Sequence, residues 1–192
     1  MELTDILNLI YPVSKESAQR LQKHCTPVSF DKKELIIKDN EVDRYIYIIK
    51  DGIVRCGFRH GDMEDTVLFG MEGDAIGAVH SLLHDLPSPF FYEVITKVDA
   101  LKIHIDDFNS LIKIDHELLM WWQAYLFDGM FVFEHKYAYF AMKDAYERYI
   151  TFLGKRPELA KEIPVKYIAQ YLNISRETLS HSRQIRQRLS DI

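Results

Sequence analysis

The chain has 192 residues, of which 47% are hydrophobic and 28% charged, and its formal net charge is −5. This length accommodates one large domain or two modest ones, each with its own core, and the composition is not that of a disordered chain. No apolar run reaches the length of a membrane span, and the acidic N-terminus lacks the basic region of a secretory signal. Cys25 and Cys56 are too few and too far apart for a disulfide framework, which favours a reduced, cytoplasmic protein.

The first half of the chain is predicted to form short β-strands, after an amphipathic helix that ends near Pro12. β-forming residues alternate there with turn signals. Strands are expected at residues 34–38, 45–50, 53–59, 66–69, 91–96 and 100–105. Asp51–Gly52 is expected to make a tight hairpin turn between two of these strands. Many short strands at this spacing predict a small jelly-roll or barrel-like β-sandwich.

From Asp106 onwards the pattern becomes helical, with a short helix at 106–112 and a long one from His116 to about Tyr139. The long helix carries apolar residues at a seven-residue spacing, as in a coiled-coil seam. This seam consists of Leu119, Trp122, Leu126, Phe133 and Tyr137. Further aromatic residues lie on its other faces, so the helix is expected to pack on its own β domain and on a second partner. Gly129, inside the seam, permits either a close helix approach or a bend, and both interpretations stay open.

Two short helices joined by a tight turn are predicted between Ile163 and Leu189. The first spans Val165–Tyr171. Asn173 after it can adopt the left-handed conformation that ends a helix, and Ser175 is a good N-cap for the second helix. The spacing directs Leu179 inward, so the polar face of the second helix is left outside. The pattern is typical of a helix-turn-helix.

The outward face of this second helix has the composition of a DNA-reading surface. Arg and Gln bind base edges in the major groove, while Ser and basic side chains suit phosphate. The candidate DNA-binding residues are Ser175, Arg176, Glu177, Ser180, His181, Arg183 and Gln184, with Lys166 on the first helix. Residues 161–192 carry six Lys/Arg against three Asp/Glu, which leaves about −8 on the first 160 residues. A basic end on an acidic body favours DNA binding over a helical hairpin with a solvated face.

The segment SRETLS at Ser175–Ser180 resembles the start of the recognition helix in the catabolite-activator (Crp/Fnr) family of bacterial transcription regulators. The remaining parts of the chain follow the same order. The resemblance implies an α+β chain with a cyclic-nucleotide-binding-like sensor domain at 1–112, a linker and dimerisation helix at 113–140, and a helix-turn-helix DNA-binding domain at 141–192. It further implies a homodimer, in which the long helices pair across a two-fold axis, and double-stranded DNA as the partner.

The resemblance assigns base reading to Arg176 and Glu177. The best-known members of the family have a second Arg where this chain has His181, so a different operator preference is expected. The β-hairpin wing that usually precedes the motif is replaced by residues 154–164, which are too few for two strands and a turn. Fewer backbone contacts predict weaker affinity and a shallower salt dependence.

The cyclic-nucleotide cassette of the family has a glycine turn, an acidic residue for the ribose, and an Arg followed by a small hydroxyl residue for the phosphate. The effector-pocket positions that match it here are Gly73, Asp74, Ile76 and Gly77 for the turn, Ala78 for the acid, and Ser88 and Pro89 for the phosphate pair. No Lys or Arg lies between Gly70 and Phe91, and a buried phosphate needs a cationic or multiply donating partner. The sequence therefore predicts that the effector is not cAMP, and that it is an uncharged or apolar small molecule or is lacking altogether.

Neither an enzyme nor a metalloprotein is predicted. His60, His80, His84 and His104 are dispersed and form no H-x-H pair, unlike the ligands of a metal-dependent cupin. An iron–sulfur cluster needs four cysteines, and no spacing indicates a haem site. No catalytic residue, metal ligand or cofactor is therefore expected. The alternative to a DNA-binding regulator is an effector-binding or protein-interaction module with a vestigial helix-turn-helix, which the negative net charge and the missing wing favour.

Overall fold

The computed structural model describes residues 2–61, 63–155, 157 and 159–190. It contains two compact units, one of residues 1–64 and 68–129 and the other of residues 65–67 and 130–192. The long helix α5 (His116–Met142) begins in the first unit and ends in the second.

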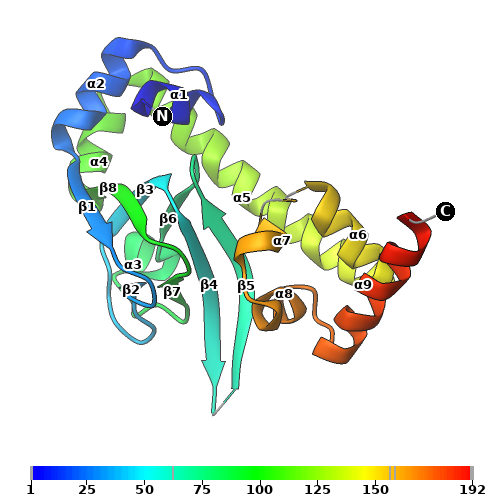
Figure 1. The fold of residues 1–192 in the computed structure, drawn as a ribbon. Coiled ribbons are helices and arrows are strands. Elements are labelled where there is room, and N and C mark those ends of the chain that lie inside the picture. The colour runs from blue at the N-terminus through cyan, green and yellow to red at the C-terminus, as the bar shows by residue number, and fades with distance from the viewer. Residues whose placement is uncertain (1, 62, 156, 158, 191–192) are drawn as a thin grey trace. The chain divides into compact units, whose positions relative to one another are not determined.

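The first unit contains the strands and the N-terminal helices (Figure 1). Its elements are α1 (Leu3–Asn8), α2 (Lys15–His24), β1 (Thr26–Phe30), β2 (Leu35–Ile37), β3 (Tyr45–Asp51), β4 (Ile53–His60), most of β5 (Met63–Met71), β6 (Ala75–Gly77), α3 (Val79–His84), β7 (Phe91–Val94), β8 (Val98–His104) and α4 (Ile105–Ile112). The second unit contains α6 (Ala145–Lys155), α7 (Leu159–Glu162), α8 (Val165–Tyr171) and α9 (Arg176–Ser190).

The strands form two four-stranded sheets, with the orders β1-β8-β3-β6 and β2-β7-β4-β5. Strand β3 has both of its faces buried, because residues that alternate along a strand point to opposite sides. Ile46 and Ile48 join a core beneath the helices, whereas Tyr47 and Ile49 join the core between the sheets. The predicted α+β class with a β-sandwich, a long helix and C-terminal helices is confirmed.

The predicted hairpin at Asp51–Gly52 is wrong. Strands β3 and β4 belong to different sheets, so this turn carries the chain from one sheet to the other. Gly52 has a φ of 95°, and a Cβ atom there would lie 2.2 Å from the carbonyl oxygen of Lys97. The sequence correctly indicated a turn here, because the close approach requires glycine. A turn residue does not, however, determine which strands pair with each other.

Other predicted elements differ from the structure mainly at their ends. The strand expected at 66–69 is the middle of the nine-residue β5, and the long helix continues to Met142. Helix α5 is unbroken at Gly129, where an added Cβ would have nothing within 4 Å. Helices α2, α3, α6 and α7 and strands β1 and β6 were not predicted.

The start of α5 is fixed to the N-terminal helices, as Figure 1 shows for α1, α2 and α4. The indole Nε1 of Trp121 donates to the carbonyl oxygen of Leu7 at 3.1 Å. Asp115, which is buried, accepts from Ser17 Oγ at 3.1 Å and from Arg20 Nη1 at 2.8 Å. It also caps the helix through the amide of Leu118 at 3.3 Å. A buried carboxylate that is satisfied in this way holds the helix start in one position.

Candidate functional site

Helices α8 and α9 form the predicted helix-turn-helix within the second unit. Asn173 has a φ of 52° and so ends the first helix in the left-handed conformation. The hydroxyl of Ser175 accepts from the amide of Thr178 at 3.1 Å, which makes it the N-cap of α9. Leu179 and Ser182 are buried, and Ser182 Oγ donates to the carbonyl oxygen of Thr178 at 3.0 Å. Local sequence signals thus place the turn and the inward face of α9.

The core of the second unit holds these two helices against α6 and α7. It consists of Tyr149, Phe152, Leu159, Ile163, Ile168, Ala169, Leu172 and Leu179, all of which are buried. The rings of Phe152 on α6 and Tyr171 at the end of α8 lie 5.7 Å apart. Because the apolar sides of the helices meet one another, the polar side of α9 is left outside.

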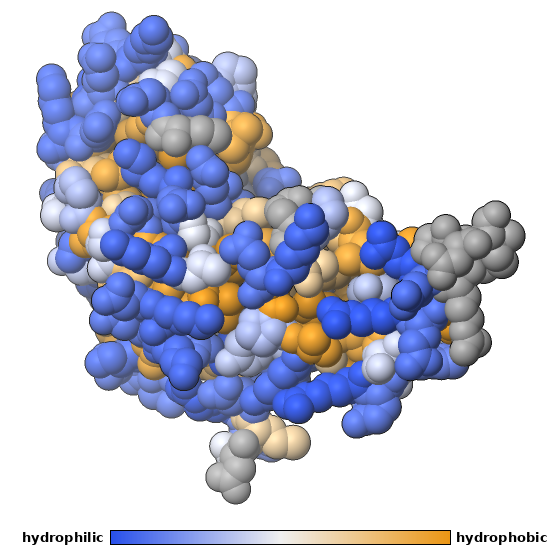
Figure 2. All heavy atoms as spheres, in the orientation of Figure 1, coloured by the Kyte–Doolittle hydropathy of each residue, from blue (hydrophilic) through white to orange (hydrophobic). Residues whose placement is uncertain are grey.

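The candidate DNA-binding residues lie together on the outer face of α9 and on α8. Ser175, Arg176, Glu177, Ser180, His181, Gln184 and Lys166 are exposed, and Arg183 is half-buried. Figure 2 shows that the surface over α9 is hydrophilic. A hydrogen bond from the Ser175 side chain, and to a lesser degree the charge of Arg176, holds the pKa of Glu177 below its usual range. Glu177 is therefore a carboxylate at neutral pH, which can accept from the amino group of cytosine.

The cassette positions fall on β6, α3 and the loop that follows, all within the first unit. Gly73 has a φ of 92°, and its amide donates to the carbonyl oxygen of Ile49 at 3.0 Å. Asp74 Oδ2 accepts from the amide of Met71 at 2.8 Å, which closes the turn before β6. Ile76 and Gly77 are buried in β6 opposite β3. The glycine turn therefore has a complete structural role without a ligand.

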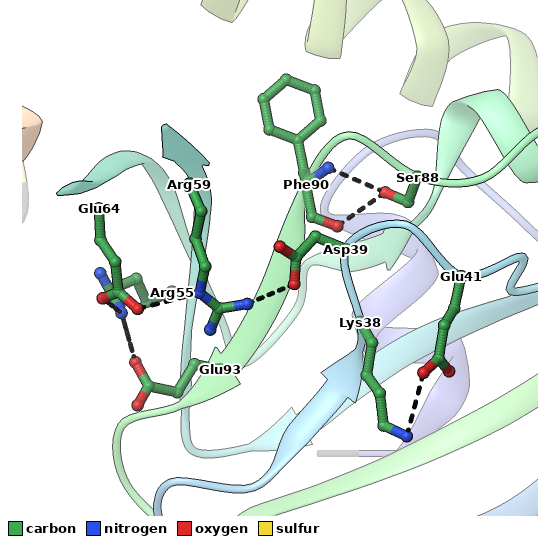
Figure 3. Close-up of polar contacts among 9 residues, drawn as sticks. All are labelled: Lys38, Asp39, Glu41, Arg55, Arg59, Glu64, Ser88, Phe90 and Glu93. Atoms are coloured by element: carbon green, nitrogen blue, oxygen red, sulfur yellow. Dashed lines mark hydrogen bonds and ion pairs between the residues drawn. The ribbon is translucent and has the colours of Figure 1, made fainter. Parts of the chain in front are cut away.

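The positions that would bind ribose and phosphate have no charged group. Ala78 is buried at the start of α3. Ser88 is also buried, but its hydroxyl donates to the carbonyl oxygen of Phe90 at 2.7 Å and accepts from the amide of Phe90 at 3.1 Å (Figure 3). Pro89 is exposed. The one hydroxyl at the phosphate position is thus turned into its own loop.

A buried cation does lie on β4, the strand that pairs with β7. The sequence did not indicate it. The side chain of Arg55 on β4 is only 1% exposed, and its Nη2 lies 2.7 Å from Glu93 Oε2 and 2.9 Å from Glu64 Oε2 (Figure 3). Arg59, four residues further along, pairs with Glu64 and Asp39. Because the cluster joins β4 to residues up to 38 positions away, no local spacing could reveal it.

The guanidinium of Arg55 points away from the core between the sheets. Its strand neighbour Val54 belongs to that core, and so does Val94, which lies opposite Val54 on β7. Alternation along the strand then turns Arg55 to the opposite face, where Glu93 lies opposite it. This arginine is thus ion-paired with carboxylates outside the core between the sheets. It does not supply the cation that a cyclic phosphate would need.

A small apolar hollow lies beside the cassette, between α3, β6 and the first half of α5. It is lined by Ile46, Ile76, Gly77, Val79, Leu82, Leu83, Trp122, Tyr125 and Leu126. This lining suits an uncharged group and opposes a phosphate. Two residues not singled out from the sequence for this region, Tyr92 and Tyr125, direct their hydroxyls at the cassette backbone.

The apolar seam predicted on α5 is exposed along much of its length. Leu119, Leu126 and Phe133 are each more than 40% exposed and Tyr137 is 81% exposed, whereas Trp122 is half-buried. Phe127, Met130, Phe131 and Val132 beside the seam are also exposed. A row of large apolar side chains of this length is uncommon on the surface of a monomer.

Comparison with known proteins defines the first unit. Residues 27–115 match the family model of the cyclic nucleotide-binding domain. This stretch is similar to a cyclic nucleotide-binding domain. This assignment agrees with the two antiparallel sheets and the glycine turn before β6, while the lack of charge at Ala78, Ser88 and Pro89 distinguishes this domain from the nucleotide-binding pattern of the family. No curated protein sequence matches the chain significantly.

Solved structures share the whole arrangement of a cyclic nucleotide-binding domain followed by C-terminal helices. FixK2 from Bradyrhizobium japonicum matches with a TM-score of 0.76 and 20% identity, over 86% of each chain. The c-di-GMP-responsive global regulator CLP from Xanthomonas campestris matches with a TM-score of 0.74 and 12% identity, over 92% of this chain and 93% of that one. The catabolite activator protein of Thermus thermophilus matches with a TM-score of 0.60 and 17% identity, over 95% and 87%. The resemblance to the Crp/Fnr family is thus confirmed at the level of the fold.

Within the described part of the chain, no three His, Cys, Asp or Glu side chains gather in a way that could hold a metal ion. Among the same residues, no helix combines the length and apolar character needed to cross a bilayer. Cys25 and Cys56 are both free thiols.

Proposed function

We propose that this protein is a sequence-specific, DNA-binding transcription regulator of the Crp/Fnr type that acts as a homodimer. The observation that carries the proposal is the polar outer face of α9, with Arg176, Glu177 and Ser180 exposed at the start of a helix whose other side is packed on α6 and α8. The match to a cyclic nucleotide-binding domain and the likeness in fold to the catabolite activator protein support it.

We assign one function to each of three consecutive parts of the chain. Residues 1–112 act as a sensor domain, residues 113–140 as the linker and dimerisation helix, and residues 141–192 as the DNA-binding domain. The exposed seam of α5 supports pairing of two copies, because two recognition helices must reach half-sites about one DNA turn apart.

The proposed effector is a small molecule other than cAMP, or none. This is supported by the apolar lining beside the cassette and by the carboxylate partners of Arg55. Burial of a cyclic phosphate among such groups would leave its charge unpaired. Addition of cAMP is therefore expected to leave the melting temperature of the full-length protein unchanged.

Selection from random duplex DNA, followed by gel shifts on the selected sequence, tests the proposal. The wild type should enrich one sequence, and Arg176→Ala should weaken binding to it by roughly 10- to 100-fold, the effect of about 1–3 kcal/mol for a bidentate base contact. Lys113→Ala, which removes one exposed positive charge from the first unit, is the matched control and should bind like the wild type. Failure of the wild type to select any sequence at low salt would favour a protein-interaction module with a vestigial helix-turn-helix.

A further inference from the structure

Two tyrosine hydroxyls donate hydrogen bonds to the backbone of the cassette strand β6. Tyr125, on the first half of α5, donates to the carbonyl oxygen of Ala75 at 2.6 Å. Tyr92, on β7, donates to the carbonyl oxygen of Gly77 at the longer distance of 3.3 Å. Ala75 and Gly77 are the first and last residues of β6, and both are buried. The strand is therefore attached to the long helix and to the second sheet through side chains of this chain.

The position of β6 in its sheet explains why these carbonyl groups need a partner. Strand β6 lies at the end of the order β1-β8-β3-β6, so β3 is its one neighbouring strand there. The carbonyl oxygen of Asp74 accepts from the amide of Ile49 on β3. Because backbone groups alternate in direction along a strand, the carbonyl groups of Ala75 and Gly77 point to the open edge. A buried carbonyl group without a hydrogen bond would be costly there.

The surroundings make Tyr125 the stronger of the two attachments. Ile76, Trp122 and Leu126 line the apolar hollow together with the ring of Tyr125, so its hydrogen bond to Ala75 lies beside apolar groups. Burial, and secondarily the charges of Asp74 and Asp128, raises the pKa of Tyr125 well above its usual value. The hydroxyl therefore keeps its proton, and with it its ability to donate, throughout the physiological pH range.

We propose that Tyr125 replaces an effector: its hydroxyl holds the cassette strand to the long helix, so that the protein binds DNA without any small molecule. The inference rests on the proposed function and specifies how it is regulated. It agrees with the other features of the cassette, since Ser88 is hydrogen-bonded within its own loop and the buried Arg55 is paired with two glutamates. The groups that would receive a nucleotide are thus absent or already occupied by the chain itself.

Hydrogen exchange of the full-length, ligand-free protein tests the attachment. Tyr125→Phe removes one oxygen atom and should make the peptide covering residues 75–84 exchange about tenfold faster than in the wild type, because the carbonyl group of Ala75 loses its donor. Tyr11→Phe is the control, since the Tyr11 ring packs against the same core, and it should leave this peptide unchanged. Equal exchange in Tyr125→Phe and the wild type would overturn the inference.

DNA binding tests the consequence on the sequence that the wild type selects. Ligand-free Tyr125→Phe should bind this sequence about tenfold more weakly than the wild type, while Tyr11→Phe should bind equally well. A Tyr125→Phe protein with wild-type affinity overturns the inference. If the wild type selects no sequence, the proposed function fails, and the exchange experiment still decides whether Tyr125 holds the cassette strand.

Native mass spectrometry of the wild-type complex needs no variant, so it decides even if Tyr125→Phe does not fold. The complex with the selected DNA should have the mass of protein and duplex alone. Adding cAMP at millimolar concentration should change neither this mass nor the affinity. An additional small molecule in the DNA-bound complex, or a tenfold gain in affinity on addition of cAMP, would overturn the inference.

Discussion

The guanidinium of Arg148, on α6, lies 2.9 Å from the carbonyl oxygen of Leu172 at the end of α8. The same nitrogen, Nη1, lies 3.3 Å from the carbonyl oxygen of Asn173 in the turn, and Nε donates to the carbonyl oxygen of Lys143 at 3.0 Å. All four residues belong to the second unit. One side chain therefore ties the turn of the helix-turn-helix to the residue that directly follows α5.

We expect Arg148→Ala to loosen this turn. The substitution removes three hydrogen bonds from a charged donor and should lower the free energy of unfolding by about 1–3 kcal/mol. Binding to the selected DNA should weaken with it, because the start of α9 follows the turn directly. Urea denaturation and gel shifts measure the two effects. Arg148→Lys should recover only part of the loss, since a point charge cannot bridge carbonyl groups as the guanidinium fork does.

The control for Arg148 is Lys161→Ala, an exposed cation of α7 in the same unit. It should change the free energy of unfolding by no more than a few tenths of a kcal/mol. If Arg148→Ala proves as stable as Lys161→Ala, the three hydrogen bonds do not hold the turn.

Asn173 offers a second test of the same turn through its backbone. Its φ of 52° is tolerated by Asn and Gly but is unfavourable for β-branched residues. Asn173→Val should therefore lower the free energy of unfolding by about 1–2 kcal/mol. Asn173→Gly serves as the matched control and should stay within about 1 kcal/mol of the wild type. Thermal denaturation distinguishes the two, and equal melting temperatures would contradict the left-handed turn.

The helix-turn-helix was predictable because its signals are local. Asn173, Ser175 and the spacing up to Leu179 specify a helix end, a cap and an inward face within seven residues, and no distant contact is needed to read them. The missed strands β1 and β6 depend on contacts from elsewhere in the chain. Strand β6 has three residues and is defined by its pairing with β3, and β1 contains Pro27, which suits its place at the edge of a sheet.

The candidate site divides in the same way. The lack of cationic residues between Gly70 and Phe91 was visible in the sequence. The prediction that the effector is not cAMP could therefore be made without a structure. The groups that occupy the region instead could not be found, because Tyr125 lies 50 residues from its partner Ala75. The partners of Arg55 likewise come from β5 and β7. Hydrogen bonds between distant segments leave no periodic pattern in a sequence.

The ion cluster around Arg55 predicts a dependence of stability on pH. Burial acts to raise the pKa of Glu64, but its hydrogen bonds and ion pairs with Arg55 and Arg59 outweigh this effect, so the pKa lies below its usual value. A carboxyl group whose pKa is lowered by folding stabilises the protein above its unfolded pKa of about 4.3. This stabilisation is lost as the pH falls through the lower, folded pKa.

Arg55→Met should remove that stabilisation and leave Glu64 and Glu93 without their shared cation. We expect the free energy of unfolding at pH 7 to fall by about 3–5 kcal/mol, the range for breaking a buried ion pair by removing one partner. The further loss between pH 6 and pH 3 should then be smaller than in the wild type. Urea denaturation across this range provides both values.

Lys38→Met is the control for the ion cluster, and Figure 3 shows its pair with Glu41 in the same region. Both partners of that pair are more than half exposed. Its removal should therefore cost less than about 1 kcal/mol. Equal losses for Arg55→Met and Lys38→Met would mean that burial of Arg55 gives the cluster no special role.

The exposed seam of α5 predicts that the oligomeric state is sensitive to one charge. Phe133 belongs to the seven-residue pattern and is 52% exposed, so in a dimer its ring would be covered by the second copy. Phe133→Glu would place a carboxylate in that apolar contact, where it would lack a partner. We expect the dissociation constant of the dimer to rise by about a hundredfold or more, as measured by sedimentation velocity over a dilution series.

The matched control for Phe133→Glu introduces the same charge outside the seam. Ala138 is exposed on the same helix five residues further along, away from the seven-residue positions, so Ala138→Glu should stay dimeric. Since each monomer would reach only one half-site, Phe133→Glu should also bind a two-half-site operator more weakly, while its affinity for a single half-site should not change. If Phe133→Glu sediments like Ala138→Glu at every concentration, the two copies do not pair through this seam, and the exposed aromatic residues of α5 must serve another contact.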